Sequence, residues 1–223
     1  MIGHYAQTTA APEHLALEDF EEAGVRAAVR YFLAKDLIFA PGDPDTHLYF
    51  LLSGTVRLYK FYGRYKEATV ALLKDGGVFG ELSLEEGSRQ EVFAEALADS
   101  QVAVVPKALL AEAIRRSPWF ATKLLFSFSE RLRQSEEVIE SLLDREVSAR
   151  LATLLVHLAE RFGETNGSGT VLNLRLTHQD LANMIVSTRE AVSKVMSEFQ
   201  RDGLIEVRNR RRIAISPRLA EMS

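Results

Sequence analysis

Charged side chains with the chemistry to contact nucleic acid gather in the last third of this 223-residue sequence. Arg189, Glu190 and Lys194 fall on one face of a predicted helix, close to its first turn, and Ser193 continues that face. An arginine can pair with guanine O6 and N7, and a glutamate can accept from the cytosine amino group. Surface helices also carry Arg–Glu pairs for solubility alone. The basic residues nearby nevertheless favour a helix that reads base edges in the major groove.

A shorter predicted helix precedes this one, and together they have the spacing of a helix-turn-helix over residues 176–196. Thr177 is expected to cap the first helix, with Asp180 at its N3 position. Ser187 is expected to cap the second helix, so Glu190 could instead close a capping box with it. Val186 stands where the turn of such a motif usually has glycine. The predicted buried faces comprise Leu181, Ile185, Val192, Val195, Met196 and Phe199.

A basic strand pair is predicted after Gly203, where four arginines lie close together between residues 206 and 215. Such a hairpin, or wing, can place its charges against phosphates, which position a protein on DNA without reading the sequence. The residues expected to contact DNA are therefore Thr177, His178, Gln179, Ser187, Thr188, Arg189, Glu190, Ser193, Lys194, Arg208, Arg210, Arg211 and Arg212.

The elements that position these residues begin with a β-rich region over 31–105, where short apolar stretches alternate with turn residues. Many short strands at this spacing suggest an antiparallel sandwich or barrel. Residues 1–30 form a polar, partly helical lead-in to which no function is assigned. Nearer the C-terminus, an amphipathic helix is predicted over 150–162, a polar loop over 164–169 and a strand over 171–174.

A short helix over 107–116 is followed by a long one from Ser117, a predicted N-cap before Pro118 at the first helical position, to about Leu143. Apolar residues recur along it at three- and four-residue steps, interrupted only by Ser135. The stripe could pack on its own domain, but the helix's length and its polar other faces favour a coiled coil between two copies. The expected dimer interface comprises Leu125, Phe128, Leu132, Ser135, Ile139 and Leu142.

Composition narrows the function classes. The formal net charge of −4 argues against nucleic acid when taken alone, but binding depends on local charge, and the basic residues here are concentrated at one end. The absence of cysteine excludes disulfides, iron–sulfur clusters and cysteine-based zinc sites. The five histidines are scattered, so no metal site is expected. No apolar run approaches the roughly 20 residues that a membrane span needs, and no secretory signal is visible, so a cytoplasmic location without membrane contact is expected.

The sequence resembles the cyclic-AMP receptor protein and FNR superfamily of bacterial regulators from about residue 31 to 218. The resemblance rests on Pro-Gly-Asp at 41–43, the segments 49–54 and 78–84, the long helix and the helix-turn-helix. Residues 131–136, together with Arg150-Leu151 and Phe162-Gly163, look most like the cyanobacterial global nitrogen regulators.

The resemblance implies an α+β fold with an N-terminal antiparallel β-roll of the cyclic-nucleotide-binding type, a long dimerisation helix and a C-terminal winged helix-turn-helix. The expected domain limits are 1–30 for the lead-in, 31–116 for an effector-type roll, 117–143 for the dimerisation helix and 144–223 for the DNA-binding domain. The implied function is a transcription regulator that binds palindromic double-stranded DNA as a homodimer and contacts RNA polymerase.

The effector of such a roll is less determined. Cyclic-AMP binders have an Arg-Ser pair where this sequence has Gln90-Glu91, and a carboxylate there would repel a phosphate. Arg131 and Glu136 resemble residues that help nitrogen regulators bind 2-oxoglutarate, although the roll arginine of that branch falls at Val92. Three alternatives for the effector therefore remain: 2-oxoglutarate, cyclic AMP, which is less favoured, and no small effector at all. The candidate effector residues are Phe79, Gly80, Glu81, Leu82, Arg89, Gln90, Arg131, Ser135 and Glu136.

Other classes have less support. Related rolls in metal-dependent enzymes need a histidine cluster that His47 alone cannot supply. Haem ligation by histidine has only His47 in the roll, an isolated residue on a predicted strand. No catalytic motif stands out, so no enzyme activity and no certain cofactor are expected. A cyclic-nucleotide-type regulatory module that acts by protein contact would account for the roll but not for the winged helix.

Overall fold

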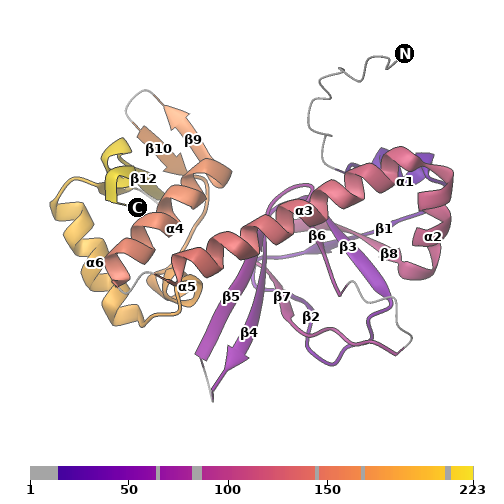
Figure 1. The fold of residues 1–223 in the computed structure, drawn as a ribbon, viewed down its shortest axis with the longest axis horizontal. Coiled ribbons are helices and arrows are strands. Elements are labelled where there is room, and N and C mark those ends of the chain that lie inside the picture. Colours follow the sequence, from indigo (N-terminus) through magenta and orange to yellow (C-terminus); the bar gives the residue numbers. More distant parts are fainter. Residues whose placement is uncertain are drawn as a thin grey trace, which may run out of the picture. The chain divides into compact units, whose positions relative to one another are not determined.

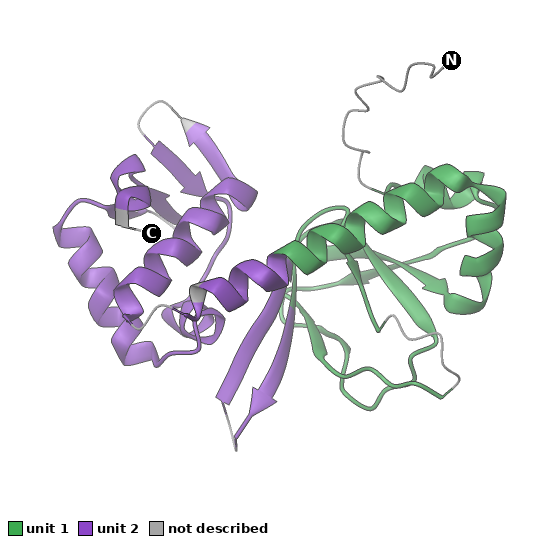
Figure 2. Ribbon diagram, viewed as in Figure 1, with its two compact units in different colours: residues 1–57, 73–133 green, residues 58–72, 134–223 purple. Residues whose placement is uncertain are grey.

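The computed structural model describes residues 15–63, 66–81, 87–143, 146–166, 169–208 and 212–222. The chain divides into two compact units: unit 1 holds residues 1–57 with 73–133, and unit 2 holds residues 58–72 with 134–223 (Figure 2). These units group residues differently from the four expected segments, because residues 58–72 go with the C-terminal part. The expected domain limits stay a prediction.

Antiparallel strands dominate unit 1, as the turn spacing predicts (Figure 1). The strand orders are β1-β8-β3-β6 in one sheet and β2-β7-β4-β5 in another. The elements up to the first long helix are α1 (Leu17–Glu22), β1 (Ala28–Phe32), β2 (Leu37–Phe39), β3 (His47–Ser53), β4 (Val56–Tyr62), β5 (Lys66–Leu73), β6 (Val78–Phe79), β7 (Phe93–Ala96), β8 (Ser100–Pro106) and α2 (Lys107–Arg116). Strand β4 begins in unit 1 and continues into unit 2, and β5 lies in unit 2 except for Leu73.

The core of unit 1 forms where apolar side chains of β3 and β8 meet the helices. Leu48 and Phe50 are buried on β3, because alternate residues of a strand point to the same side. Phe20 of α1 contacts Phe50 and Phe120 edge-on, with ring centroids 4.5 and 5.3 Å apart. Aromatic pairs in this geometry add stabilisation beyond their buried area.

Residues 15–30, expected to belong to a polar lead-in, contribute to the core of unit 1. Leu15 and Phe20 belong to the hydrophobic core, and Asp19 forms a buried ion pair with Lys123, whose Nζ lies 2.8 Å from Oδ1. Strand β1 was not predicted. Its residues do not alternate between buried and exposed, and Tyr31 is exposed, so the sequence carries no period-two signal for this strand. The strand forms because its backbone pairs with β8.

The helices α2 and α3 (Pro118–Ser141) follow the sequence predictions closely. Ser117 accepts a hydrogen bond from the backbone N–H of Phe120 at 3.2 Å, which confirms it as the cap of α3. The helix ends two residues before the predicted Leu143. With 24 residues it is about 36 Å long at 1.5 Å per residue.

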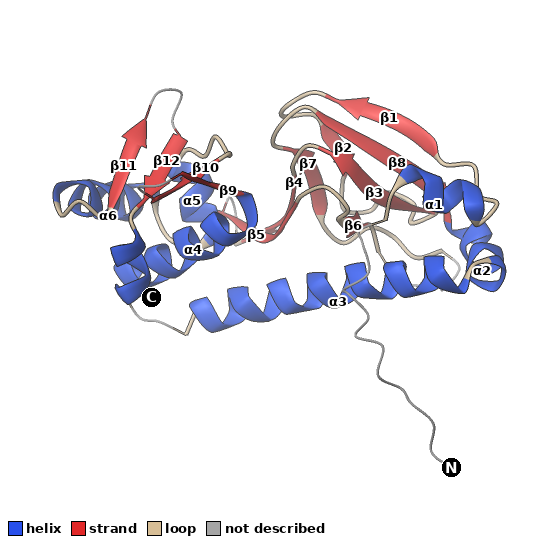
Figure 3. Cartoon of the chain, turned by 90° about the horizontal axis from the view of Figure 1, so that it is seen from above, coloured by secondary structure: helices blue, strands red, loops and turns tan. Residues whose placement is uncertain are grey.

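Unit 2 combines helices with a small antiparallel sheet ordered β11-β12-β10-β9 (Figure 3, helices blue and strands red). Residues 164–166, predicted as loop, pair with β10 as part of β9, and the strand predicted over 171–174 lies at β10 instead. These polar residues form strands because of cross-strand pairing, with Thr165 opposite Thr170. The elements are α4 (Val147–Phe162), β9 (Gly163–Asn166), β10 (Gly169–Leu172), α5 (His178–Met184), α6 (Arg189–Arg201), β11 (Ile205–Arg208), β12 (Arg212–Ile215) and the 3-10 helix η2 (Pro217–Met222).

Candidate nucleic-acid interface

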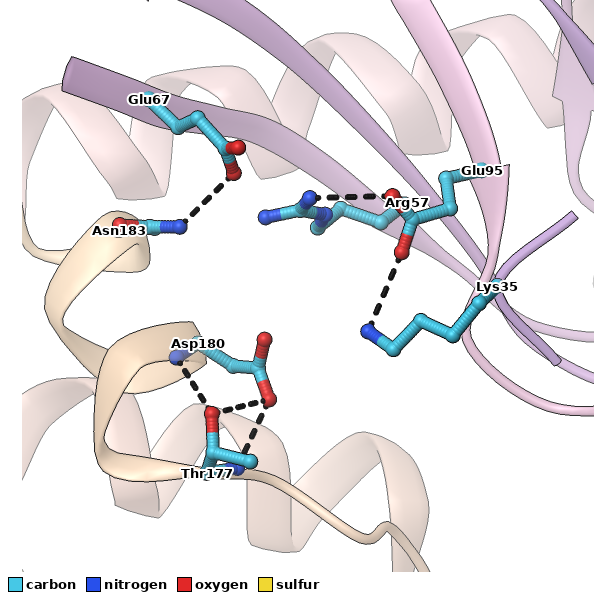
Figure 4. A network of polar contacts seen from close by, with 7 residues as sticks. All are labelled: Lys35, Arg57, Glu67, Glu95, Thr177, Asp180 and Asn183. Carbon is cyan, nitrogen blue, oxygen red and sulfur yellow. Dashed lines mark hydrogen bonds and ion pairs between the residues drawn. The ribbon is translucent and has the colours of Figure 1, made fainter. Parts of the chain in front are cut away.

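Helix α5 begins with the capping box that its sequence predicts. Thr177 Oγ1 accepts from the backbone N–H of Asp180 at 3.1 Å, and Asp180 Oδ2 accepts from the backbone N–H of Thr177 at 2.8 Å (Figure 4). Both donors would otherwise lack partners at the helix start. The reciprocal bonds fix the first turn of the helix-turn-helix.

Helix α6 begins one residue later than predicted. Thr188, not Ser187, is its N-cap, and Thr188 Oγ1 accepts from the backbone N–H of Ala191 at 3.2 Å. The backbone N–H of Ser187 instead donates back to Ala182 at 2.9 Å, within the turn. Position N3 is consequently Ala191, so Glu190 does not close a capping box with Ser187. Its carboxylate is exposed at the second position of the helix.

The turn between α5 and α6 is made without glycine. Val186 takes a left-handed conformation with φ of +50°. This conformation is strained for a β-branched residue, by about 1–3 kcal/mol. The buried stripe of α6 compensates locally, since Val192, Met196 and Phe199 are buried as predicted.

The expected base-reading side chains share the exposed start of α6. Arg189, Glu190 and Lys194 are exposed, while Ser193 is half-buried because its hydroxyl lies 2.8 Å from His178 Nδ1. A groove of about 550 Å³ runs beside them, lined by Thr177, His178 and Gln179, by Arg189, and by Val207 and Ile213 of the following strands. Residues from α5, α6, β11 and β12 therefore face one concave surface.

The strand pair β11–β12 carries cationic side chains in register. Arg208 and Arg212 are cross-strand partners and both are exposed. Like charges directly opposite each other destabilise a strand pair, so the arrangement gains from a bound anion. Arg208 Nε also donates to Glu206 at 2.9 Å. Arg210 and Arg211, at the tip of the expected wing, lie outside the described residues.

The effector candidates in unit 1 are satisfied by the protein's own groups. The backbone N–H of Glu81 donates to Gln90 Oε1 at 3.1 Å, and Gln90, only 2% exposed, donates through Nε2 to Asp45 at 3.0 Å. Asp45 also accepts from Ser88 at 2.8 Å and pairs with Lys107. The carboxamide of Gln90 is therefore fixed at both ends.

The remaining effector candidates are divided between the units. Arg131 Nη1 donates to the carbonyl of Gly80 at 3.2 Å; burial lowers the pKa of Arg131, and the Glu81 carboxylate opposes that shift. Arg89 is exposed and donates to Gly42 at 2.6 Å, while Phe79 is buried. Ser135 and Glu136 belong to unit 2, and Leu82 lies outside the described residues.

Comparison with known proteins decides the family. A cyclic nucleotide-binding domain model matches residues 29–117, and a Crp-like helix-turn-helix domain model matches residues 149–220. The global nitrogen regulator of Synechococcus elongatus is 34% identical over 93% of this chain and 96% of its own length. This chain belongs to the CRP/FNR family of transcription regulators.

Solved structures of the CRP/FNR family have a fold similar to that of this chain. FixK2 from Bradyrhizobium japonicum is 25% identical with a TM-score of 0.75, covering 89% of this chain and 98% of that protein. A CRP/FNR-family regulator from Thermus thermophilus is 29% identical with a TM-score of 0.67, covering 87% of this chain and 97% of that one. The fold and the function as a DNA-binding transcription regulator follow, as the sequence predicts.

Three polar contacts of this CRP/FNR-family regulator are not predicted by its sequence. Asn183 of α5 donates to Glu67 of β5 at 2.9 Å, inside unit 2 (Figure 4). In unit 1, Glu95 accepts from Arg57 at 3.4 Å and from Lys35 at 3.2 Å. The partners in the first pair are 116 residues apart, and no spacing signal connects them.

In the described segments, no helix is long and apolar enough to span a bilayer, and no cluster of three potential ligands could hold a metal.

Proposed function

We propose that this regulator acts as a homodimer whose two α6 helices enter successive major grooves of a palindromic site. Dimeric helix-turn-helix proteins read half-sites about 34 Å apart, one turn of DNA. In this proposal Arg189 and Glu190 contact base edges, Lys194 adds a point charge, and the arginines of β11 and β12 contact phosphates. The single observation that carries it is the exposed Arg189–Glu190–Lys194 face at the start of α6.

Exposed apolar residues on α3 support the homodimer. Leu125, Leu132 and Ile139 are 67%, 63% and 61% exposed in the single chain, at seven-residue steps. A heptad stripe of this kind is the seam that two-stranded coiled coils bury. Phe128, also expected at the seam, packs partly against the core of unit 1. Contact with RNA polymerase rests on the family alone.

Electrostatics at the start of α6 support anion contact. The first turn of a helix carries partial positive charge, so an arginine at its first position is locally unfavourable in the free protein. Arg189 occupies that position and has no salt-bridge partner among the described residues. A negative or electron-rich ligand, such as a guanine edge beside phosphates, relieves this cost.

A small anionic effector would bind in the roll, and the resemblance to nitrogen regulators favours 2-oxoglutarate over cyclic AMP. A specific observation favours the second candidate, a regulator that needs no effector. The Glu81 N–H, which an anion beside Gly80 would require, is already bonded to Gln90. Because Gln90 is also held by Asp45, displacing it would break two hydrogen bonds.

Glu190 with Arg189 is compatible with a TGTGA-like half-site, as in the wider family. Fluorescence anisotropy tests the proposal with a TGTGA-N6-TCACA duplex and a scrambled duplex, each without ligand, with 2-oxoglutarate and with cyclic AMP. Preferential binding to the palindrome supports DNA reading by α6. A rise with one ligand identifies the effector, whereas equal binding in all three conditions supports the effector-independent candidate. Equal, weak and salt-sensitive binding to both duplexes would contradict sequence reading at this site.

A further inference from the structure

A small cavity of about 60 Å³ lies inside unit 2, separate from the groove beside α6. Its walls come from strand β5, the C-terminal part of α3, helix α4 and the end of α5. Most of the lining is alanine, valine, leucine and methionine. Polar groups enter from Thr69 on β5, Gln134 and Glu137 on α3, and His157 and Arg161 on α4. A largely apolar hollow with a few convergent polar groups is the usual form of a ligand site.

Two of these polar groups have buried atoms that the protein leaves unsatisfied. Thr69 Oγ1 and Gln134 Oε1 have no hydrogen-bond partner in the described part of the chain. Thr69 is 6% exposed, so water outside the protein does not reach its hydroxyl. Buried polar side-chain atoms are nearly always bonded, and an exception requires an explanation such as a bound molecule. Two exceptions on the wall of one cavity point to an occupant.

The unsatisfied atoms define the head of that occupant. Gln134 Oε1 requires a donor, and the Thr69 hydroxyl can donate or accept. A primary carboxamide or a hydroxyl meets both requirements. Glu137 and Arg161 carry opposite charges on the same wall, so neither sign of ion gains a net attraction that would offset the cost of its desolvation. Arg161 is also held in place, since its Nη2 donates to the Leu72 carbonyl at 2.7 Å.

The volume defines the size of the occupant. A cavity of about 60 Å³ exceeds the roughly 10–15 Å³ that one water needs, so it admits a small molecule. A molecule of about five or six non-hydrogen atoms fits, whereas cyclic AMP is far larger. The site therefore differs in place, charge and size from the anion position near Gly80.

We propose that this cavity binds a small uncharged molecule with a carboxamide-like head and a short apolar body. The head bonds to Thr69 and Gln134, and the body contacts the aliphatic side chains of β5, α4 and α5. Because Met184 of α5 lines the cavity, the occupant touches the first helix of the helix-turn-helix.

Methyl NMR on the full-length protein tests the site directly. The chain has four methionines, and ¹³C-methyl labelling gives each its own signal. Met184 lines the cavity, whereas Met196 lines the groove beside α6 and serves as an internal control. Titration with isobutyramide is expected to shift the Met184 signal to saturation and to leave Met196 unchanged. Isobutyrate has nearly the same shape but carries a charge, and is expected to produce no saturable shift.

Two variants link the binding to the unsatisfied atoms. Thr69→Val removes the hydroxyl at nearly constant volume and is expected to weaken isobutyramide binding at least ten-fold without lowering the unfolding temperature. Thr69→Ser keeps the hydroxyl and is expected to bind within about two-fold of wild type. Gln134→Leu provides a second loss of binding if Thr69→Val does not fold.

Three results would overturn the proposal. The first is the absence of a saturable Met184 shift, which would leave only solvent in the cavity. The second is equal binding of isobutyramide and isobutyrate. The third is unchanged binding in both Thr69→Val and Gln134→Leu.

Discussion

Replacing Arg189 with alanine is expected to relax sequence recognition at one base pair of each half-site without harming the fold. Arg189 is exposed at the first position of α6 and has no salt-bridge partner among the described residues, so truncation breaks no internal contact. Loss of a positive charge beside the helix N-terminus should leave stability unchanged or raise it by a few tenths of a kcal/mol. An arginine paired with guanine contributes about 1–3 kcal/mol of discrimination.

The effect on binding follows from the dimer. Both half-sites lose one contact, so the affinity for the palindrome should fall by about 2–6 kcal/mol, or at least 30-fold, until non-specific binding sets the floor. Competition anisotropy with duplexes that vary one base pair at a time would locate the lost contact. Specificity should relax at a single position in each half-site, while binding to scrambled DNA changes little.

Arg201→Ala is the matched control, because Arg201 is an exposed arginine in the last turn of the same helix. Its removal is expected to leave DNA affinity within about two-fold of wild type. The reasoning is refuted if Arg189→Ala and Arg201→Ala bind the palindrome equally. It is also refuted if Arg189→Ala weakens palindromic and scrambled duplexes by the same factor, since that would make Arg189 a phosphate contact.

Three further substitutions test separate parts of the account. Thr188→Ala removes the α6 cap and should lower the unfolding free energy by about 1 kcal/mol in urea denaturation, whereas Ser187→Ala should lower it by less; the reverse order would restore Ser187 as the cap. Leu132→Asp should convert the dimer into a folded monomer by sedimentation velocity, with Glu140→Ala as an exposed control on α3, and a persistent dimer would place the interface elsewhere. Gln90→Leu should destabilise the roll by about 1–3 kcal/mol, since the Glu81 N–H and Asp45 each lose a buried partner, and an unchanged thermal midpoint would contradict its internal role.

The parts of the fold that sequence predicts well are those set by local rules. The start of α3 follows from a Ser-Pro cap, and the box between Thr177 and Asp180 follows from their three-residue spacing. The buried face of α6 follows from helical periodicity. In each case, the residues that decide the structure are close together in the chain.

The parts of the fold that the sequence does not predict are of two kinds. Some depend on partners far away in the chain, and others depend on a choice between adjacent residues of similar chemistry. Strand β1 exists because β8 pairs with it, and the Asn183–Glu67 bond joins residues from separate elements. Ser187 and Thr188 are adjacent hydroxyl residues, and only the turn geometry around Val186 selects the second as cap. Gln90 looked like a missing phosphate ligand, but the structure fixes its carboxamide between Glu81 and Asp45.

The central claim, that two α6 helices read one palindrome together, is tested most directly by changing the distance between half-sites. Affinity should be measured by anisotropy for the TGTGA-N6-TCACA duplex and for one with about five extra base pairs at its centre, half a helical turn. The account predicts that the insertion lowers affinity at least 100-fold, because the half-sites then face opposite sides of the DNA. Equal affinity for the two duplexes would contradict a dimer that reads both half-sites at once.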